Sequence, residues 1–131
     1  MDGPTHQDAI LVLQLAHLRA TLGVSEASSW MWSDQFVTDP VQFLKKYPSG
    51  SEGHGKAAKI CGYFEILGVL YKYGLINEDL LFDWVAVVPA WDRVKSFPLG
   101  VRQRSGNPQL WHNFEAMAEA QRRWYHNREI L

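Results

Sequence analysis

Apolar residues recur at intervals of three and four positions along almost the whole chain, and this spacing limits the fold more than any other feature of the sequence. Leu11, Leu15 and Leu18 follow it near the start, and residues 57–71 follow it again. Side chains with this spacing lie on one face of an α-helix. Residues 85–88 could form a short strand, but no second strand is available to pair with it. We therefore predict an all-α fold, a bundle of five or six helices.

Start and stop signals divide this pattern into helices. Asp8 and Asn77 can cap helices, and Pro89 can kink or end one. Because apolar residues surround most of the first helix, we expect that helix to be central rather than peripheral. The expected helices cover about residues 8–22, 25–32, 40–47 (capped by Thr38 or Asp39), 54–73, 77–97 with a break or kink at Pro89, and 107 onward.

The last helix is expected to begin at Asn107, with Pro108 in its first position. Phe114, Gln121 and Trp124 share one face of that helix. At 131 residues the chain has the length of one domain. We therefore expect a single helical domain over residues 1–131.

Composition narrows the classes of protein that remain. Hydrophobic residues make up 47% of the chain, which is too many for a disordered segment. The single cysteine, Cys61, has no partner for an internal disulfide, and its apolar neighbours favour a buried core residue. The longest apolar stretch, residues 9–18, is shorter than the ~20 residues that cross a membrane, and no secretory signal precedes it. We expect a cytoplasmic protein with no membrane span.

Charge argues against a nucleic-acid partner. The formal net charge of −1 supplies no positive field for a phosphate backbone. Near the C-terminus, Arg122, Arg123 and Arg128 alternate with Trp124 and Tyr125, and such a mixture can stack on bases. The simpler interpretation has Trp124 packed inward and the arginines solvated, so we expect no nucleic-acid binding.

A glycine-rich segment nearly matches a nucleotide-binding loop. Residues 50–57 read Gly-Ser-Glu-Gly-His-Gly-Lys-Ala, but Ala57 stands where a P-loop needs a hydroxyl for Mg²⁺, and a helical pattern precedes the segment instead of a strand. A nucleotide triphosphatase is therefore not expected. A helix that begins in such a loop can still hold an anion on its backbone amides. The residues of this hypothetical anion site are Gly53, Gly55, Lys56 and Lys59; the alternative is a flexible loop with a solvated lysine pair.

Glu65 is the most informative single residue, because nearly all its neighbours in residues 62–71 are apolar. A buried carboxylate needs a donor or a proton. We expect a structural partner, an arginine or a hydroxyl, that fixes helix packing, with Arg93 and Arg102 as candidates because the following helices should return alongside. The alternatives are exposure beside Lys72 and a functional acid.

Three consecutive bulky residues, Trp30, Met31 and Trp32, cannot all face the core. At least one should lie near the surface or in a groove. Tryptophan and methionine are favoured at protein interfaces, so these three residues form a candidate binding patch. The alternative is that they cap one end of the bundle.

Metal and catalytic motifs are weak. His112, Glu115 and Glu119 share one helical face, but carboxylate-bundle metal sites use Glu-x-x-His pairs from several helices. No nucleophile-histidine-acid arrangement occurs. We therefore predict no metal, no cofactor and no catalytic residue, and an enzyme is the less expected class.

Several features together resemble a known family. Residues 62–68 contain an aromatic-Glu-x-x-Gly helix, and residues 73–81 contain a Gly-Leu-Ile turn with an acidic cap. Trp91 lies in the following helix, and Pro108 and Trp111 form a Pro-x-x-Trp start to the last one. Over about residues 57–120 the sequence resembles a bacterial family catalogued only as a domain of unknown function. The resemblance implies an all-α fold in which the acid of the first motif is shared, and it implies no activity. It also implies an N-terminal membrane anchor, from which this chain departs.

Three functions from different classes remain open. The leading expectation is a non-enzymatic helical module that binds a protein partner or self-associates, because helices are apolar on more than one face and Trp30, Met31 and Trp32 are clustered. The second is a small-ligand or anion-binding bundle. The third is an enzyme that uses Glu65.

Overall fold

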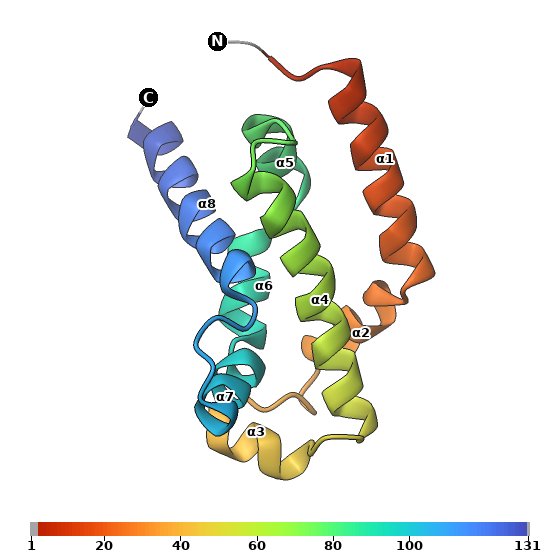
Figure 1. Cartoon of the computed structure of the whole chain (residues 1–131), viewed down its shortest axis with the longest axis vertical. Helices are drawn as coiled ribbons and strands as arrows, with labels where there is room; N and C mark the ends of the chain where they lie inside the picture. Colours follow the sequence, from red (N-terminus) through yellow and green to blue (C-terminus); the bar gives the residue numbers. More distant parts are fainter. Residues whose placement is uncertain (1–2, 131) are drawn as a thin grey trace.

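The computed structural model describes residues 3–130, and every regular element in that part of the chain is a helix. The all-α prediction is confirmed, although residues 3–130 form eight helices instead of five or six. They pack into one compact bundle, with the start of α1 and the end of α8 at the same end (Figure 1). The helices are α1 (His6–Thr21), α2 (Val24–Met31), α3 (Pro40–Lys46), α4 (Glu52–Lys72), α5 (Glu78–Trp84), α6 (Val87–Val94), α7 (Ser96–Ser105) and α8 (His112–Ile130).

The two additional helices arise at prolines. α5 ends at Trp84 and α6 begins at Val87, so Pro89 occupies the first turn of α6. Pro98 occupies the first turn of α7 in the same way. A first turn tolerates proline because the missing N–H would have no partner within the helix. Of the two outcomes expected at Pro89, a kink and a helix end, the structure has an end, but it lies before the proline instead of at it.

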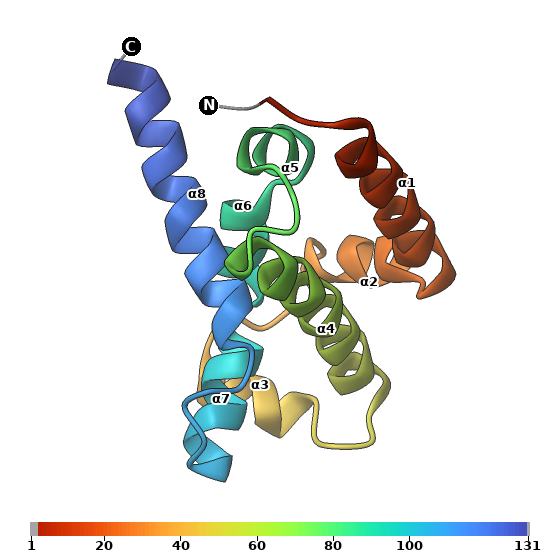
Figure 2. The same ribbon diagram turned by 45° about the horizontal axis from the view of Figure 1, so that its top comes forward.

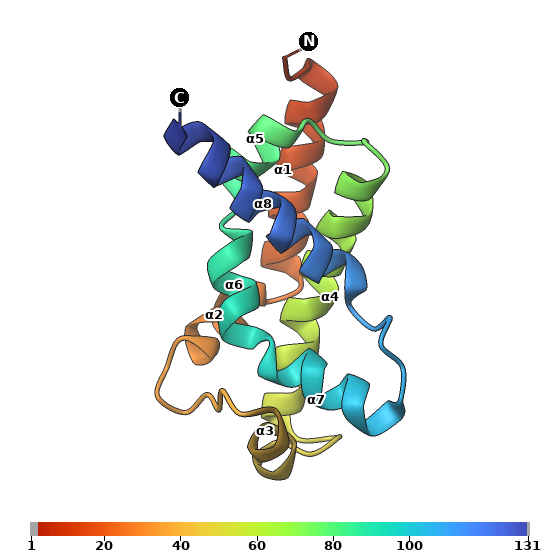
Figure 3. The same cartoon turned by 90° about the vertical axis from the view of Figure 1, so that its left-hand side faces the viewer.

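α4 is the central helix and contacts α2, α6, α7 and α8 (Figures 2 and 3). Its closest approach to α8 depends on Gly68. A Cβ atom there would stand 2.5 Å from the backbone oxygen of Asn113. One turn earlier, the ring of Phe64 stacks on that of Phe114 with centroids 4.7 Å apart. The absent side chain at position 68 thus lets two long helices pack tightly around stacked aromatics.

α1 lies at the edge of the bundle, so the expectation that it is central is wrong (Figures 1 and 2). Leu15 is the one residue of α1 that is fully buried. Its backbone oxygen accepts a 2.9 Å hydrogen bond from the Tyr63 hydroxyl on α4. Apolar residues on every side of a helix do not indicate which side is covered, and here the bundle covers only one. None of the helices within residues 3–130 has both the length and the apolarity needed to cross a bilayer.

The caps of α1 and α8 differ from those expected. Thr5 caps α1 in a capping box with Asp8, which lies three residues into the helix and is not the cap itself. α8 begins at His112 and not at Asn107. The Asn107 side chain accepts a bond from the Gln109 backbone N–H at 2.9 Å, a local turn that competes with helix capping. Asn77 caps α5 as predicted.

Candidate functional site

Trp30, Met31 and Trp32, at the end of α2, have different surroundings. Trp30 is half-buried and packs edge-on against Phe36 and Tyr47, with centroids 5.2 and 5.3 Å away. Met31 is 2% exposed, whereas Trp32 is 56% exposed. Met31 and Trp32 line a pocket to which Trp30 does not contribute. The structure therefore divides the candidate patch into a packing residue and two pocket residues.

This pocket, which we call the α2–α6 pocket, lies between α2, α4 and the turn from α5 to α6. Its volume is about 270 Å³. That volume lies between the ~150 Å³ of an engineered cavity that holds benzene and the ~300 Å³ at which ordinary ligand sites begin. The inner lining is buried and includes Met31, Tyr63, Phe64 and Ala90. The outer lining includes Arg19, Ser28, Trp32, Trp84, Val85 and Pro89.

The polar side chains that line the α2–α6 pocket are hydrogen-bond donors, and none of them is a carboxylate. Arg19 is the one charged residue of the lining, and its guanidinium contacts the Ser25 hydroxyl at 3.4 Å. No carboxylate within residues 3–130 forms an ion pair with Arg19. Burial raises the pKa of Tyr63, and the positive charge of Arg19 opposes this rise only in part. The tyrosine hydroxyl is therefore neutral at physiological pH and remains a donor to α1.

Arg93 holds the rim of the pocket in place. Its guanidinium donates to the backbone oxygens of Met31 and Ser33 at 2.7 and 2.8 Å. The same group lies 5.6 Å from the ring centroid of Trp32, within cation–π range. An exposed tryptophan is thereby fixed at the mouth of the pocket.

The second feature is the outer face of α1. Leu13 is 70% exposed and Ile10 is 55% exposed. α1 carries only two charged residues, and both turn toward the bundle: Asp8 accepts a 3.0 Å bond from the Asn77 backbone, and Arg19 lines the pocket. The side of α1 that faces solvent thus has no acidic residue, lysine or arginine, and Ile10 and Leu13 are its large apolar residues.

Glu65 has a structural partner, but not the partner that was expected. Its two carboxylate oxygens accept 2.8 Å bonds from the Asn113 side chain and the Phe114 backbone N–H in the first turn of α8. Trp111, which precedes α8, has a left-handed backbone and no side-chain oxygen to cap the helix. Glu65 supplies that cap from α4, and negative charge is favourable at a helix N-terminus.

The expected pairing of Glu65 with Arg93 or Arg102 is wrong. Arg93 bonds the end of α2, as described above. Arg102 donates to the Leu110 backbone oxygen and pairs with Glu115, each at 2.8 Å. Both arginines thus stabilise turns and helix ends on other segments. The donors to Glu65 lie at the start of α8, which begins at His112, five residues after the expected start at Asn107.

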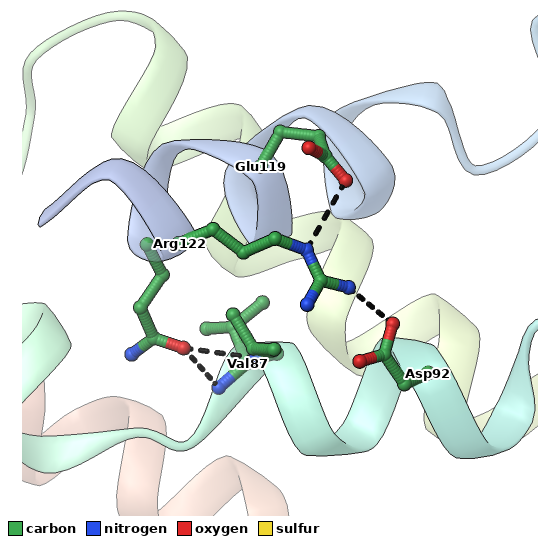
Figure 4. A network of polar contacts seen from close by, with 6 residues as sticks. Val87, Asp92, Glu119 and Arg122 are labelled. Atoms are coloured by element: carbon green, nitrogen blue, oxygen red, sulfur yellow. Dashed lines mark hydrogen bonds and ion pairs between the residues drawn. The ribbon is translucent and has the colours of Figure 1, made fainter. Parts of the chain in front are cut away.

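Gln121 is a buried polar residue whose role the sequence did not reveal. Its side-chain oxygen accepts bonds from the backbone N–H groups of Val87 and Val88, and its nitrogen donates to two backbone oxygens at the end of α5. α6 has no local side-chain cap, so α8 provides one. Figure 4 shows this contact at Val87, with the ion pairs of Arg122 to Asp92 and Glu119 beside it. The inward position of Gln121 was predictable, but its partners were not.

The proposed anion site begins inside α4, not in a loop. Gly53 packs under Tyr47, since a Cβ atom there would lie 2.3 Å from the ring. Lys56 pairs with Glu52 at 3.3 Å. These contacts give the glycine and one lysine a role in packing and place an acid in the first turn of the helix. The anion site itself, including Gly55 and Lys59, stays a prediction.

The Cys61 thiol and the side chains that could bind a metal ion are the remaining candidates for reactive chemistry. Cys61 is fully buried in α4, and burial raises the pKa of its thiol, which makes it an unreactive core residue. Within residues 3–130, no three histidine, cysteine, aspartate or glutamate side chains are grouped closely enough to hold a metal ion.

Comparison with known proteins gives a family but no activity. The family described as "Domain of unknown function (DUF4760)" matches residues 4–124. The chain belongs to this family. The resemblance to an uncharacterised family is confirmed, and the match extends well beyond residues 57–120. No curated protein and no solved structure matches the chain.

Proposed function

We propose that this protein is a non-enzymatic interaction module that self-associates through the outer face of α1. The observation that carries the proposal is the exposure of Leu13, at 70%, on a helix whose charged side chains both turn inward. An exposed apolar strip on a soluble helix typically marks a protein-interaction surface.

The spacing of the exposed residues supports helix pairing. Five of the exposed positions of α1 are separated by alternating steps of four and three, which is the seven-residue repeat of a coiled-coil seam. α1 has 16 residues, so the seam is about 24 Å long. The residues of this α1 seam are His6, Ile10, Leu13, His17 and Ala20.

A second copy of the chain fits this seam better than a charged partner. In an antiparallel pair centred on Leu13, Ile10 of one copy lies opposite Ala16 of the other, and His6 lies opposite Ala20. The two Leu13 side chains then meet at the centre, alanines face Ile10 and His6 on either side, and no acidic residue, lysine or arginine stands in the contact. An interface of this size is small, so we expect an association in the micromolar range or weaker.

The test is the molar mass in solution over a wide range of concentration. Sedimentation equilibrium should show a monomer of 15.0 kDa that converts to a dimer as concentration rises. Leu13→Lys and Ile10→Lys should abolish the dimer, because each places a charge in the seam. Val41→Lys on α3 is the matched control, since Val41 is also an exposed apolar residue, at 51%.

A dimer that survives in Leu13→Lys, or that is lost equally in Val41→Lys, would place the contact elsewhere. A strict monomer at the highest attainable concentration would refute self-association. The enzymatic alternative has less support, since both carboxylate oxygens of Glu65 are engaged by α8.

A further inference from the structure

We infer that the α2–α6 pocket binds a small molecule that carries a carboxylate on an aromatic or aliphatic body. This inference does not depend on self-association, because the pocket faces the bundle side of α1 and the α1 seam faces solvent. Three properties of the pocket support it: its charge, its apolar lining and its rigidity.

The charge of the pocket selects an anion. Among the described residues that line the pocket, Arg19 is the one charged side chain, and no acid stands beside it to neutralise it. Within the described residues its guanidinium has a single weak contact, at 3.4 Å, to a serine hydroxyl. A guanidinium can bind a carboxylate through two parallel hydrogen bonds. The Ser28 hydroxyl lies in the same lining and can donate a further bond.

The rest of the lining selects an apolar body. The lining includes the large apolar residues Trp32, Trp84, Met31 and Phe64. The space of about 270 Å³ accepts a body larger than benzene. A ligand with one charged end and one apolar end would therefore satisfy both parts of the lining.

Contacts within the chain hold part of the lining in position. The Tyr63 hydroxyl is fixed by its 2.9 Å bond to α1, and Arg93 lies 5.6 Å from the ring centroid of Trp32 while it bonds the end of α2. A pocket whose side chains are already ordered loses less conformational entropy on binding. The arrangement is thus suited to binding a ligand, beyond filling a gap between helices.

Titration with phenylbutyrate tests the inference, with phenylbutanol as its uncharged counterpart. The readout is the NMR signal of the indole N–H groups of Trp32 and Trp84, assigned by the loss of each signal in a Trp→Phe variant. Phenylbutyrate should shift both signals saturably and bind about tenfold more tightly than phenylbutanol, because the carboxylate adds a charge-assisted bond. Isothermal titration calorimetry would give the two dissociation constants.

Two variants test separately how the charge of Arg19 and the space of the cavity contribute to binding. Arg19→Gln should weaken phenylbutyrate about tenfold and leave phenylbutanol unchanged, whereas Ser28→Met, which fills the pocket, should weaken both. Arg123→Gln, at an exposed arginine of α8, should change neither. Equal affinity for the two probes, an unchanged affinity in a folded Arg19→Gln protein, or no saturable shift at either tryptophan would overturn the inference. Circular dichroism of each variant establishes that it is folded.

Discussion

Replacement of Gln121 by leucine should be among the most destabilising single changes in this protein. Gln121 is 0% exposed and makes four hydrogen bonds to backbone groups. Its oxygen accepts from Val87 and Val88 at 2.8 and 2.9 Å, and its nitrogen donates to Phe82 and Val85 at 3.3 and 2.6 Å. Leucine fills a similar volume but has no polar atom, so all four backbone groups would lose a partner.

The size of the effect follows from these four groups. A buried N–H left without an acceptor costs about 1–3 kcal/mol, and two amides are affected. The carbonyl oxygens add less, since each has a second lone pair. Better burial of the apolar side chain offsets part of the loss. We expect the free energy of unfolding to fall by about 3–4 kcal/mol, which corresponds to roughly 10 °C in Tm for a chain of this length.

Urea denaturation followed by circular dichroism measures this change, and hydrogen exchange locates it. The amides of Val87 and Val88 should lose protection before the rest of the core, because α6 loses its cap. Gln103→Leu is the matched control: Gln103 is exposed on α7, and the same substitution there should change stability by less than about 0.5 kcal/mol. A Gln121→Leu protein within about 1 kcal/mol of wild type, with both amides still protected, would refute the reasoning.

Three further predictions concern single contacts. Glu65→Leu should lower the free energy of unfolding by about 2 kcal/mol in urea denaturation, because the Phe114 amide loses its acceptor. Glu65→Gln keeps one oxygen and should lower that free energy less, and equal losses in the two variants would contradict capping. Gly68→Ala should lower the Tm because its methyl group meets the backbone of α8, whereas Gly62→Ala, with nothing within 4 Å, should raise it slightly; similar melts would argue against the close helix contact. Asp8 has a lowered pKa, chiefly through bonds from backbone N–H groups, so its ionised form is favoured in the folded state. Wild type should thus be more stable than Asp8→Asn above the ordinary pKa of aspartate, and this difference should disappear as pH falls through the lowered pKa. Denaturation curves of the two proteins that stay equally separated from neutral to strongly acidic pH would contradict this prediction.

Local sequence signals predicted a helix correctly where the capping residue and the backbone group that it bonds lie close together in the sequence. Asn77 bonds the backbone N–H of Leu80, three residues away, and so its capping role is visible in a short window. The 3–4 spacing identified the α4 segment, whose start at Glu52 differs from the expected residue 54 because Ser51 supplies the cap. The helix at Pro40 was placed correctly, but the helices near Pro89, Pro98 and Pro108 were merged or misplaced, because a proline permits a first turn as readily as it prevents an interior one.

Tertiary structure decided which face of each helix is covered and which polar groups meet. Glu65 and Phe114 are 49 residues apart, and Gln121 and Val87 are 34 apart, so no local pattern could pair them. The pocket beside Met31 likewise exists only because four separate segments converge there.

The amino-acid sequence by itself determined the all-α class, since helical periodicity is a property of neighbouring residues. Only the folded chain decided that α1 lies at the edge with Leu13 exposed, because an apolar helix can be central or peripheral until its neighbours are placed. The candidate functions depend on the tertiary structure, because the α1 seam and the α2–α6 pocket both result from how the helices pack.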